Sequence, residues 1–222
     1  MQKLSISGVL DVGCGQGAWL SVWRELGIED VTGIDGDYVQ RNQLLIPKEH
    51  FFAKDLMQGF DMGRQFDLVQ SLEVAEHLPA SRAQTFVDSI VAHGKLVLFS
   101  AAAKGQGGDH HVNEQDYDYW RALFRARGYV VLDCIRPEIK GVRSIEAWYR
   151  YNTFLYVHQD KLSQLPEKFL AHRVPNGEKL RDVSPWLYKL RKLLVRLLPV
   201  SLATRIAKVK EVFVARTRRN CG

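Results

Sequence analysis

Apolar runs alternate with amphipathic stretches along the first 160 residues of the chain. Runs typical of buried strands occupy residues 7–13, 31–35, 50–56, 66–72 and 94–102. Helical periodicity or helix-end signals occupy residues 17–27, 37–46, 82–93 and 114–128. Because strands that alternate with helices form a parallel sheet covered on both faces, the pattern predicts an α/β domain.

Two further segments, residues 129–135 and 151–159, are rich in β-forming residues. The pattern shows no helix between them, so we expect the two strands to pair antiparallel at one edge of the sheet. The predicted fold is therefore a Rossmann-like, seven-stranded mixed sheet with helices on both faces. Residues 74–78 are expected to form a turn or a helix, and residues 103–113 are too rich in glycine and polar residues to be core.

A basic helical extension is expected over residues 161–222, after the α/β domain of residues 1–160. Ser184 and Pro185 are typical of an N-cap and a first helical residue. One face of that helix carries four leucines, Leu187, Leu190, Leu194 and Leu197. Ser201 is expected to cap a second helix, with Leu202, Ile206, Val209 and Phe213 on its apolar face.

The net charge of +6 is divided unevenly along the chain. Residues 161–222 hold 15 Lys or Arg against 4 Asp or Glu, a balance of +11, whereas residues 1–160 hold 16 against 21, a balance of −5. Such asymmetry favours an anionic partner, which is a nucleic acid, a membrane surface or a phosphorylated substrate. No apolar run reaches the roughly 20 residues of a membrane span, and three cysteines without metal-type spacing favour the reducing cytoplasm.

The stretch "VLDVGCGQGAWL", residues 9–20, places glycines at three alternate positions after the first predicted strand. A strand that enters a glycine turn and then a helix leaves backbone N–H groups open to a ligand. The third glycine comes one residue too early for the dinucleotide fingerprint G-x-G-x-x-G, and the P-loop lysine is absent. A turn that serves packing alone is the simpler alternative.

The pattern D-x-G-x-G-x-G, from Asp11 to Gly17, resembles motif I of the class I S-adenosylmethionine-dependent methyltransferases. The resemblance covers about residues 6–158 and implies that residues 1–160 form a methyltransferase domain that binds S-adenosylmethionine. It implies that Asp11 helps to hold the ammonium of the cofactor and that Gly13 offers it a carbonyl. The residues expected to bind the cofactor at this turn are Asp11, Gly13, Cys14, Gly15 and Gly17.

Asp35 ends the second predicted strand 24 residues after Asp11 and is followed by Gly36. This separation is near the roughly 20 residues expected for an acid that binds a ribose diol, and a carboxylate can accept from both hydroxyls. The alternative for Asp35 is a solvated turn residue.

Two more strand ends contribute to the expected cofactor site. The resemblance implies that Asp55 accepts from the adenine amino group and that the N–H of Leu56 meets a ring nitrogen. It also implies that Ser71 and Leu72, at the end of the fourth strand, face the methionine part of the cofactor.

Methylation of a hydroxyl group needs a base, and histidine titrates near neutral pH. We expect His111 or His110 to be this base, and His77 to be a base or an orienting residue. The alternative for His77 is a structural histidine at a helix start. N-methylation also stays open, because an amine acceptor needs less help from a base.

The segment Glu73-Val-Ala-Glu76-His77, followed by His110 or His111, resembles the Mg²⁺ or Mn²⁺ site of Hen-type small-RNA 2′-O-methyltransferases. Carboxylates and imidazoles on a hard divalent ion can lower the pKa of a substrate hydroxyl. The same segment is common in the wider family without a metal. We therefore assign no metal ligand and keep the metal as an alternative.

The expected function is S-adenosylmethionine-dependent O-methylation of a small molecule, such as a sugar, a glycan precursor or a secondary metabolite. One alternative is a metal-dependent RNA 2′-O-methyltransferase, and a second is a non-catalytic binding protein on the cofactor fold. Family members usually carry helices before the first strand, which here begins within about ten residues. We expect the basic tail to act as a lid or to form a homodimer, with membrane or nucleic-acid binding as alternatives.

Overall fold

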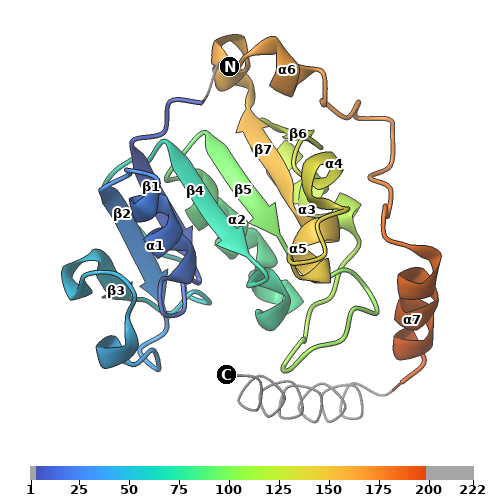
Figure 1. Ribbon diagram of the computed structural model, residues 1–222, viewed down its shortest axis with the longest axis horizontal. Helices are drawn as coiled ribbons and strands as arrows, with labels where there is room; N and C mark the ends of the chain where they lie inside the picture. The colour runs from blue at the N-terminus through green and yellow to red at the C-terminus, as the bar shows by residue number, and fades with distance from the viewer. Residues whose placement is uncertain (1–3, 199–222) are drawn as a thin grey trace.

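A seven-stranded sheet with the strand order β3-β2-β1-β4-β5-β7-β6 forms the centre of the computed structural model (Figure 1). The structure describes residues 4–198, so the helix expected after Ser201 lies outside the described residues. The strands are β1 (Gly8–Val12), β2 (Asp30–Asp35), β3 (Phe51–Ala53), β4 (Leu68–Leu72), β5 (Leu96–Ser100), β6 (Tyr129–Leu132) and β7 (Phe154–His158).

The sheet is parallel except for one strand. β1 pairs parallel with β2 and β4, and β7 lies antiparallel between β5 and β6. These pairings confirm the predicted mixed sheet and its antiparallel pair. β2 and β3 lie on one side of β1, and β4 and the later strands lie on the other. The strand order therefore reverses between β1 and β4, and sheets of this kind bind ligands at the carboxyl ends of the strands at such a switch point.

Helices cover both faces of the sheet, as predicted. On one face, Leu20 of α1 belongs to the same buried cluster as Val9 of β1, and on the other, Phe86 of α2 and Phe124 of α3 belong to a second cluster with Leu10 of β1. The α-helices are α1 (Ala18–Glu25), α2 (Ala83–Val91), α3 (Tyr117–Arg125), α4 (Arg136–Ile139), α5 (Ala147–Asn152), α6 (Glu167–Leu170) and α7 (Trp186–Arg196). Short 3-10 helices occupy Arg41–Gln43 (η1), Lys48–His50 (η2), Ala75–His77 (η3), Ala80–Arg82 (η4) and Gln159–Gln164 (η5).

The helix predicted over residues 37–46 is wrong, because only η1 is helical there. A helix of ten residues is marginal unless it packs a continuous apolar stripe. The two apolar side chains that anchor this segment, Val39 and Ile46, reach the core from an irregular path instead.

The prediction that no helix separates the last two strands is also wrong, since α4 and α5 lie between β6 and β7. Helices of four and six residues are too short to show a periodic pattern. The buried Arg136 holds this region together: its guanidinium donates to Asp133 at 2.6 Å and to the carbonyls of Tyr151 and Arg181 at 3.1 and 2.9 Å. A buried guanidinium with these partners avoids the cost of an unpaired charge.

The described part of the tail runs along the free edge of β6 and over α3. The N–H of Val174 donates to the carbonyl of Val131 at 3.1 Å, and Arg121 donates to the carbonyl of Val174 at 2.9 Å. The predicted cap at Ser184 is wrong: Pro185 takes the N-cap position, and the Ser184 hydroxyl donates to Asp182 at 2.6 Å. The helix therefore begins at Trp186, one residue later than predicted.

Candidate functional site

The structure explains why glycine occupies three positions of the turn after β1. Gly13, Gly15 and Gly17 have φ angles of 81°, 53° and 82°, and residues that carry a side chain rarely adopt such positive values. A Cβ on Gly13 would lie 2.4 Å from Val74, and one on Gly17 would lie 2.9 Å from Ile46. A Cβ on Gly15 would meet nothing within 4 Å. Packing therefore explains the first and third glycines, whereas Gly15 presents its backbone to open space.

Asp35, at the carboxyl end of β2, is tied to this turn. Its carboxylate is buried and accepts from the N–H groups of Gly15 and Gly36, each at 2.7 Å. It also accepts from the hydroxyl of Tyr38, whose ring lies against Gly36 while 80% of the residue is exposed. The structure thus shows a buried acid beside Gly15 that already receives one hydroxyl, and not a solvated turn residue.

Asp11, at the carboxyl end of β1, has an unpartnered oxygen. The residue is 2% exposed, and no donor among residues 4–198 hydrogen-bonds its Oδ2. Burial raises the pKa of Asp11 to about 7, the Gln70 side chain opposes this shift, and the Asp35 carboxylate adds to it. A buried carboxylate oxygen without a partner suits an ammonium ligand.

The remaining cofactor residues of the sequence analysis lie in different settings. Asp55 is exposed, and its Oδ1 accepts from the N–H of Met57 at 2.9 Å, while Leu56 is buried. The Ser71 hydroxyl donates to the carbonyl of Val12 at 2.9 Å, so its side chain binds the sheet. Two other predicted residues can offer backbone atoms: Leu72 is half-buried, and the Cys14 thiol is buried next to Gly33.

The segment after β4 lies directly against the glycine turn. Glu73 has a φ of 57°, and its N–H donates to the carbonyl of Ser100 at 3.0 Å. This left-handed residue turns the chain so that Val74 covers Gly13. The short helix η3, with Glu76 and His77, follows immediately.

Glu76, His77 and His111 form a cluster in which one ligand-type atom of each lies within 4.8 Å of the others. The loop of residues 103–113 is fixed to η3, because the N–H groups of Val112 and Asn113 donate to the carbonyl of Glu76 at 2.9 and 3.0 Å. This pairing brings His111 beside His77, with ring centroids 5.0 Å apart.

The Glu76 carboxylate is fully buried, and no donor among residues 4–198 meets hydrogen-bond geometry with either oxygen. Burial and the neighbouring Glu73 raise the pKa of Glu76. Burial, together with His111, lowers the pKa of His77, which favours its neutral form. The cluster therefore combines an imidazole whose neutral form is favoured with a carboxyl group that has no hydrogen-bond partner among residues 4–198.

The Glu114 carboxylate orients the imidazole of His111. The Nδ1 atom of His111 lies 2.8 Å from Glu114, whose carboxylate also accepts from the N–H groups of Gly105 and Gly107 at 2.8 and 2.6 Å. Because a carboxylate only accepts, Nδ1 donates to it and Nε2 is left to accept a proton. Sequence reasoning missed Glu114, although its place three residues after His111 was a usable signal.

Two predicted residues do not join the cluster. The side chain of His110 is 73% exposed and lies 3.6 Å from Asp109. Glu73 is held by amide donors, with Gln106 at 2.7 Å and Asn152 at 3.3 Å. Sequence reasoning also missed these two amides, and Asn152 lies 79 residues from Glu73.

Three aromatic residues pack together where α1 begins, directly after the glycine turn. Trp19, in the first turn of α1, lies 5.2 Å from Tyr149 of α5 at 90° between the ring planes, and Trp148 flanks Tyr149 at 6.1 Å. Burial raises the pKa of Tyr149, the Trp19 side chain opposes this shift, and the Glu73 and Asp11 carboxylates add to it. Helix α5, absent from the predicted elements, thus packs through Tyr149 on the start of α1.

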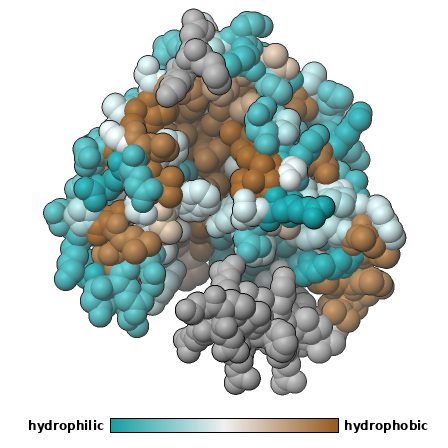
Figure 2. Space-filling model, viewed as in Figure 1, coloured by the Kyte–Doolittle hydropathy of each residue, from teal (hydrophilic) through white to brown (hydrophobic). Residues whose placement is uncertain are grey.

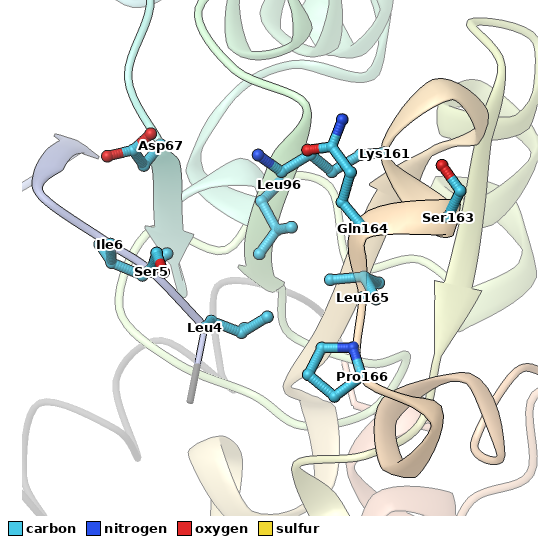
Figure 3. A pocket seen from close by; sticks show the side chains of 10 residues that line it. All are labelled: Leu4, Ser5, Ile6, Asp67, Leu96, Lys161, Ser163, Gln164, Leu165 and Pro166. Carbon is cyan, nitrogen blue, oxygen red and sulfur yellow. The ribbon is translucent and has the colours of Figure 1, made fainter. Parts of the chain in front are cut away.

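A cavity of about 420 Å³ lies at the opposite, amino-terminal end of the strands (Figure 3). Leu4, Ile6, Leu96 and Leu165 give it apolar walls. Its carboxylate, Asp67, already binds Ser7. The candidate functional site is therefore the group of residues at the carboxyl ends of β1, β2 and β4, where sheets with this strand order bind ligands.

Comparison with known proteins shows the family of the chain. The sequence profile of one family, described as "Methyltransferase domain", matches residues 5–134. No protein among curated sequences matches the chain.

Solved structures with the same fold include methyltransferases with different acceptors. The methyltransferase domain of bacterial CtHen1-C is 20% identical, with a TM-score of 0.51 over 69% of this chain and 90% of that one. The sugar N-methyltransferase KedS8 from Streptoalloteichus is 16% identical, with a TM-score of 0.53 over 69% and 80% of the chains. The small RNA methyltransferase HEN1 is 17% identical, with a TM-score of 0.52 over 70% of this chain but 23% of that one.

Proposed function

The chain belongs to the class I S-adenosylmethionine-dependent methyltransferases, and from this premise we propose that it methylates a hydroxyl group of a small molecule, with His111 as the general base. A sugar, a glycan precursor or a secondary metabolite is the proposed acceptor. The observation that carries the proposal is the imidazole of His111, held by Glu114 in the cluster next to the glycine turn. The family also favours an enzyme over a non-catalytic binding protein.

The residues present fit the cofactor of this family. The open face of Gly15 admits a ligand, Asp35 suits the ribose diol, and the unpartnered oxygen of Asp11 suits the ammonium. The adenine contacts of Asp55 and Leu56 stay predictions. The bound cofactor supplies an electrophilic methyl group, so the protein's remaining tasks are to place the acceptor and to remove its proton.

His111 suits proton removal. With Nδ1 donating to Glu114, the carboxylate stabilises the imidazolium that forms when Nε2 accepts the hydroxyl proton. The neutral His77 beside it suits a second contact with the acceptor. An amine acceptor would need neither contact, and the His111–Glu114 pair therefore supports a hydroxyl acceptor.

The aromatic border supports a ring-shaped acceptor. Trp19 and Tyr149 offer apolar faces next to polar groups, an arrangement that suits the apolar face of a sugar. One structural neighbour is a sugar N-methyltransferase, which also acts on a sugar. That enzyme methylates nitrogen, whereas the acceptor atom proposed for this chain is oxygen.

The acceptor class can be tested with methyl-labelled cofactor and a panel of sugar nucleotides, glycosides, phenols, amino sugars and RNA. We expect label in a hydroxyl-bearing small molecule, as a methyl ether identified by mass spectrometry. Label found only on amines, or only on RNA, would contradict the proposal.

The second candidate, a metal-dependent RNA 2′-O-methyltransferase, is favoured by one observation: the Glu76 carboxylate has no partner among the described residues and lies beside His77 and His111. These three residues would hold a Mg²⁺ or Mn²⁺ ion, whose chemistry would be to lower the pKa of a bound hydroxyl. Calorimetry with Mn²⁺ should then show one saturable site that Glu76→Gln removes and the exposed control Glu29→Gln keeps. The absence of such a site would exclude this candidate.

We keep a cytoplasmic location within the proposal. Cys14 and Cys134 are buried and unpaired, as expected in a reducing compartment. Within residues 4–198, no helix is long and apolar enough to cross a membrane.

A further inference from the structure

Helix α7 exposes its apolar face. Large apolar side chains that are 44–76% exposed lie on one side of it, namely Trp186, Leu187, Leu190, Leu193, Leu194 and Leu197. At about 100° per residue, these six positions span about 120° of the helix circumference. Figure 2 shows an apolar patch at the right edge of the molecule, where Figure 1 places α7.

The opposite side of α7 carries cations, and these face the body of the protein. Lys192 is 4% exposed, and its Nζ lies 2.5 Å from Asp182. Arg191 donates to the carbonyl of Gln106 at 2.9 Å, and Arg196 donates to the carbonyl of Lys104 at 3.0 Å. A surface helix normally buries its apolar stripe and exposes its charges, so α7 has the reverse orientation.

Specific contacts fix this orientation, and the leucine face stays exposed among residues 4–198. A Cβ on Gly105 would lie 2.1 Å from the carbonyl of Lys192, so a glycine is needed where α7 rests on the loop of residues 103–113. Tyr188 adds a ring contact at 5.6 Å with Tyr151. Contiguous apolar patches are rare on monomers and mark interaction sites.

We infer that the leucine face of α7 docks on an anionic lipid surface. The face combines Trp186 with leucines, as interfacial helices do, and the segment around it, residues 161–222, has a balance of +11. Apolar side chains insert at the headgroup boundary, while the surrounding cations attract the anionic lipids. The inference is independent of the methyl acceptor, because the six exposed apolar side chains of α7 are not part of the candidate functional site.

Two other occupants fit the surface less well. RNA binding would use cations and phosphates and would leave the six exposed apolar side chains of α7 in water, whereas a lipid surface takes up both. A second copy of the chain would bring two basic segments together, because residues 161–222 carry a balance of +11 in each copy.

The test is flotation of the full chain with vesicles of phosphatidylcholine alone or with 30% phosphatidylglycerol. We expect binding to the anionic vesicles, at least tenfold weaker binding to the neutral ones, and weakening by salt. The double variant Leu190→Gln/Leu194→Gln should reduce the partition coefficient at least tenfold. The matched control Leu26→Gln/Leu45→Gln, at exposed positions outside α7, should bind as the wild type does.

A second measurement does not depend on the folding of a leucine variant. Brominated lipids should quench the fluorescence of the wild type, and Trp186→Phe should remove most of that quenching. Three results would overturn the inference: no flotation with anionic vesicles at low salt, equal flotation of the α7 double variant and its control, or a leucine-dependent dimer that does not bind vesicles. Flotation competed by RNA but unaffected by the leucine substitutions would overturn it as well.

Discussion

The proposed cofactor side and the proposed acceptor side of the candidate functional site differ in what they are built from. On the cofactor side, a glycine turn and the ends of β1 and β2 present backbone groups and two carboxylates, with Gly15 only 20 residues from Asp35. On the acceptor side, side chains from separate segments meet: Glu76 and His77 follow β4, and His111 arrives on a loop fixed by Glu114. We therefore expect substitutions on the proposed cofactor side to change the affinity for the cofactor, and substitutions on the proposed acceptor side to change kcat.

The largest expected effect is on the acceptor side. His111→Asn should lower kcat about 1,000-fold, within the range for loss of a general base, and should leave the Kd of S-adenosylhomocysteine unchanged. The matched control His110→Asn should keep nearly full activity, since that side chain is 73% exposed. Steady-state kinetics give kcat, and calorimetry gives the Kd of S-adenosylhomocysteine. If His110→Asn lowered kcat and His111→Asn did not, His110 would be the base instead.

On the cofactor side, Asp35→Ala should weaken S-adenosylhomocysteine binding about 100-fold, because charge-assisted hydrogen bonds to both ribose hydroxyls are lost. Asp37→Ala is the control, since Asp37 is a neighbouring acid with a side chain that is 90% exposed. Calorimetry gives both Kd values, and the melting temperature reports any unfolding. Equal affinities for a folded Asp35→Ala protein and its control would refute the ribose assignment.

The raised pKa of Asp11 predicts a pH-dependent affinity. Below its pKa of about 7 the carboxyl group is neutral, and above it the carboxylate attracts the ammonium of the ligand. The Kd of S-adenosylhomocysteine should therefore weaken about tenfold from pH 8 to pH 6. Asp11→Asn should bind weakly at both pH values without this slope, and a slope kept by that variant would place the titrating group elsewhere.

The smallest effect should come from Tyr38→Phe. In the structure the Tyr38 hydroxyl donates to Asp35, the acceptor that a ribose hydroxyl would use. Removal of that competitor should tighten S-adenosylhomocysteine binding about threefold, the equivalent of a weak hydrogen bond. Weaker binding would mean that Tyr38 contacts the ligand directly.

The cofactor side was largely predictable because its signals are local. The signals lie within 27 residues of the sequence: a strand, alternate glycines and an acid at the end of the next strand. The structure brings Asp11, Gly15 and Asp35 to one end of the sheet. The packing partners of Gly13 and Gly17, which are Val74 and Ile46, came from distant segments and were not predictable.

The acceptor side was less predictable because tertiary contacts decide it. His110 and His111 are neighbours in sequence, and the left-handed backbone at His110, with a φ of 53°, helps to separate their directions. Helix α5 carries Tyr149 and Asn152 in only six residues, too few for a periodic signal. For α7, the sequence showed two faces but not which one the loop of residues 103–113 would bind.

The most direct test of the central claim is a crystal structure of the complex with S-adenosylhomocysteine. The account predicts the ribose hydroxyls on Asp35 with Tyr38 displaced, the ammonium beside Asp11, and the sulfur facing His77 and His111. A ligand bound in another part of the molecule, or a ribose bound without Asp35, would contradict it.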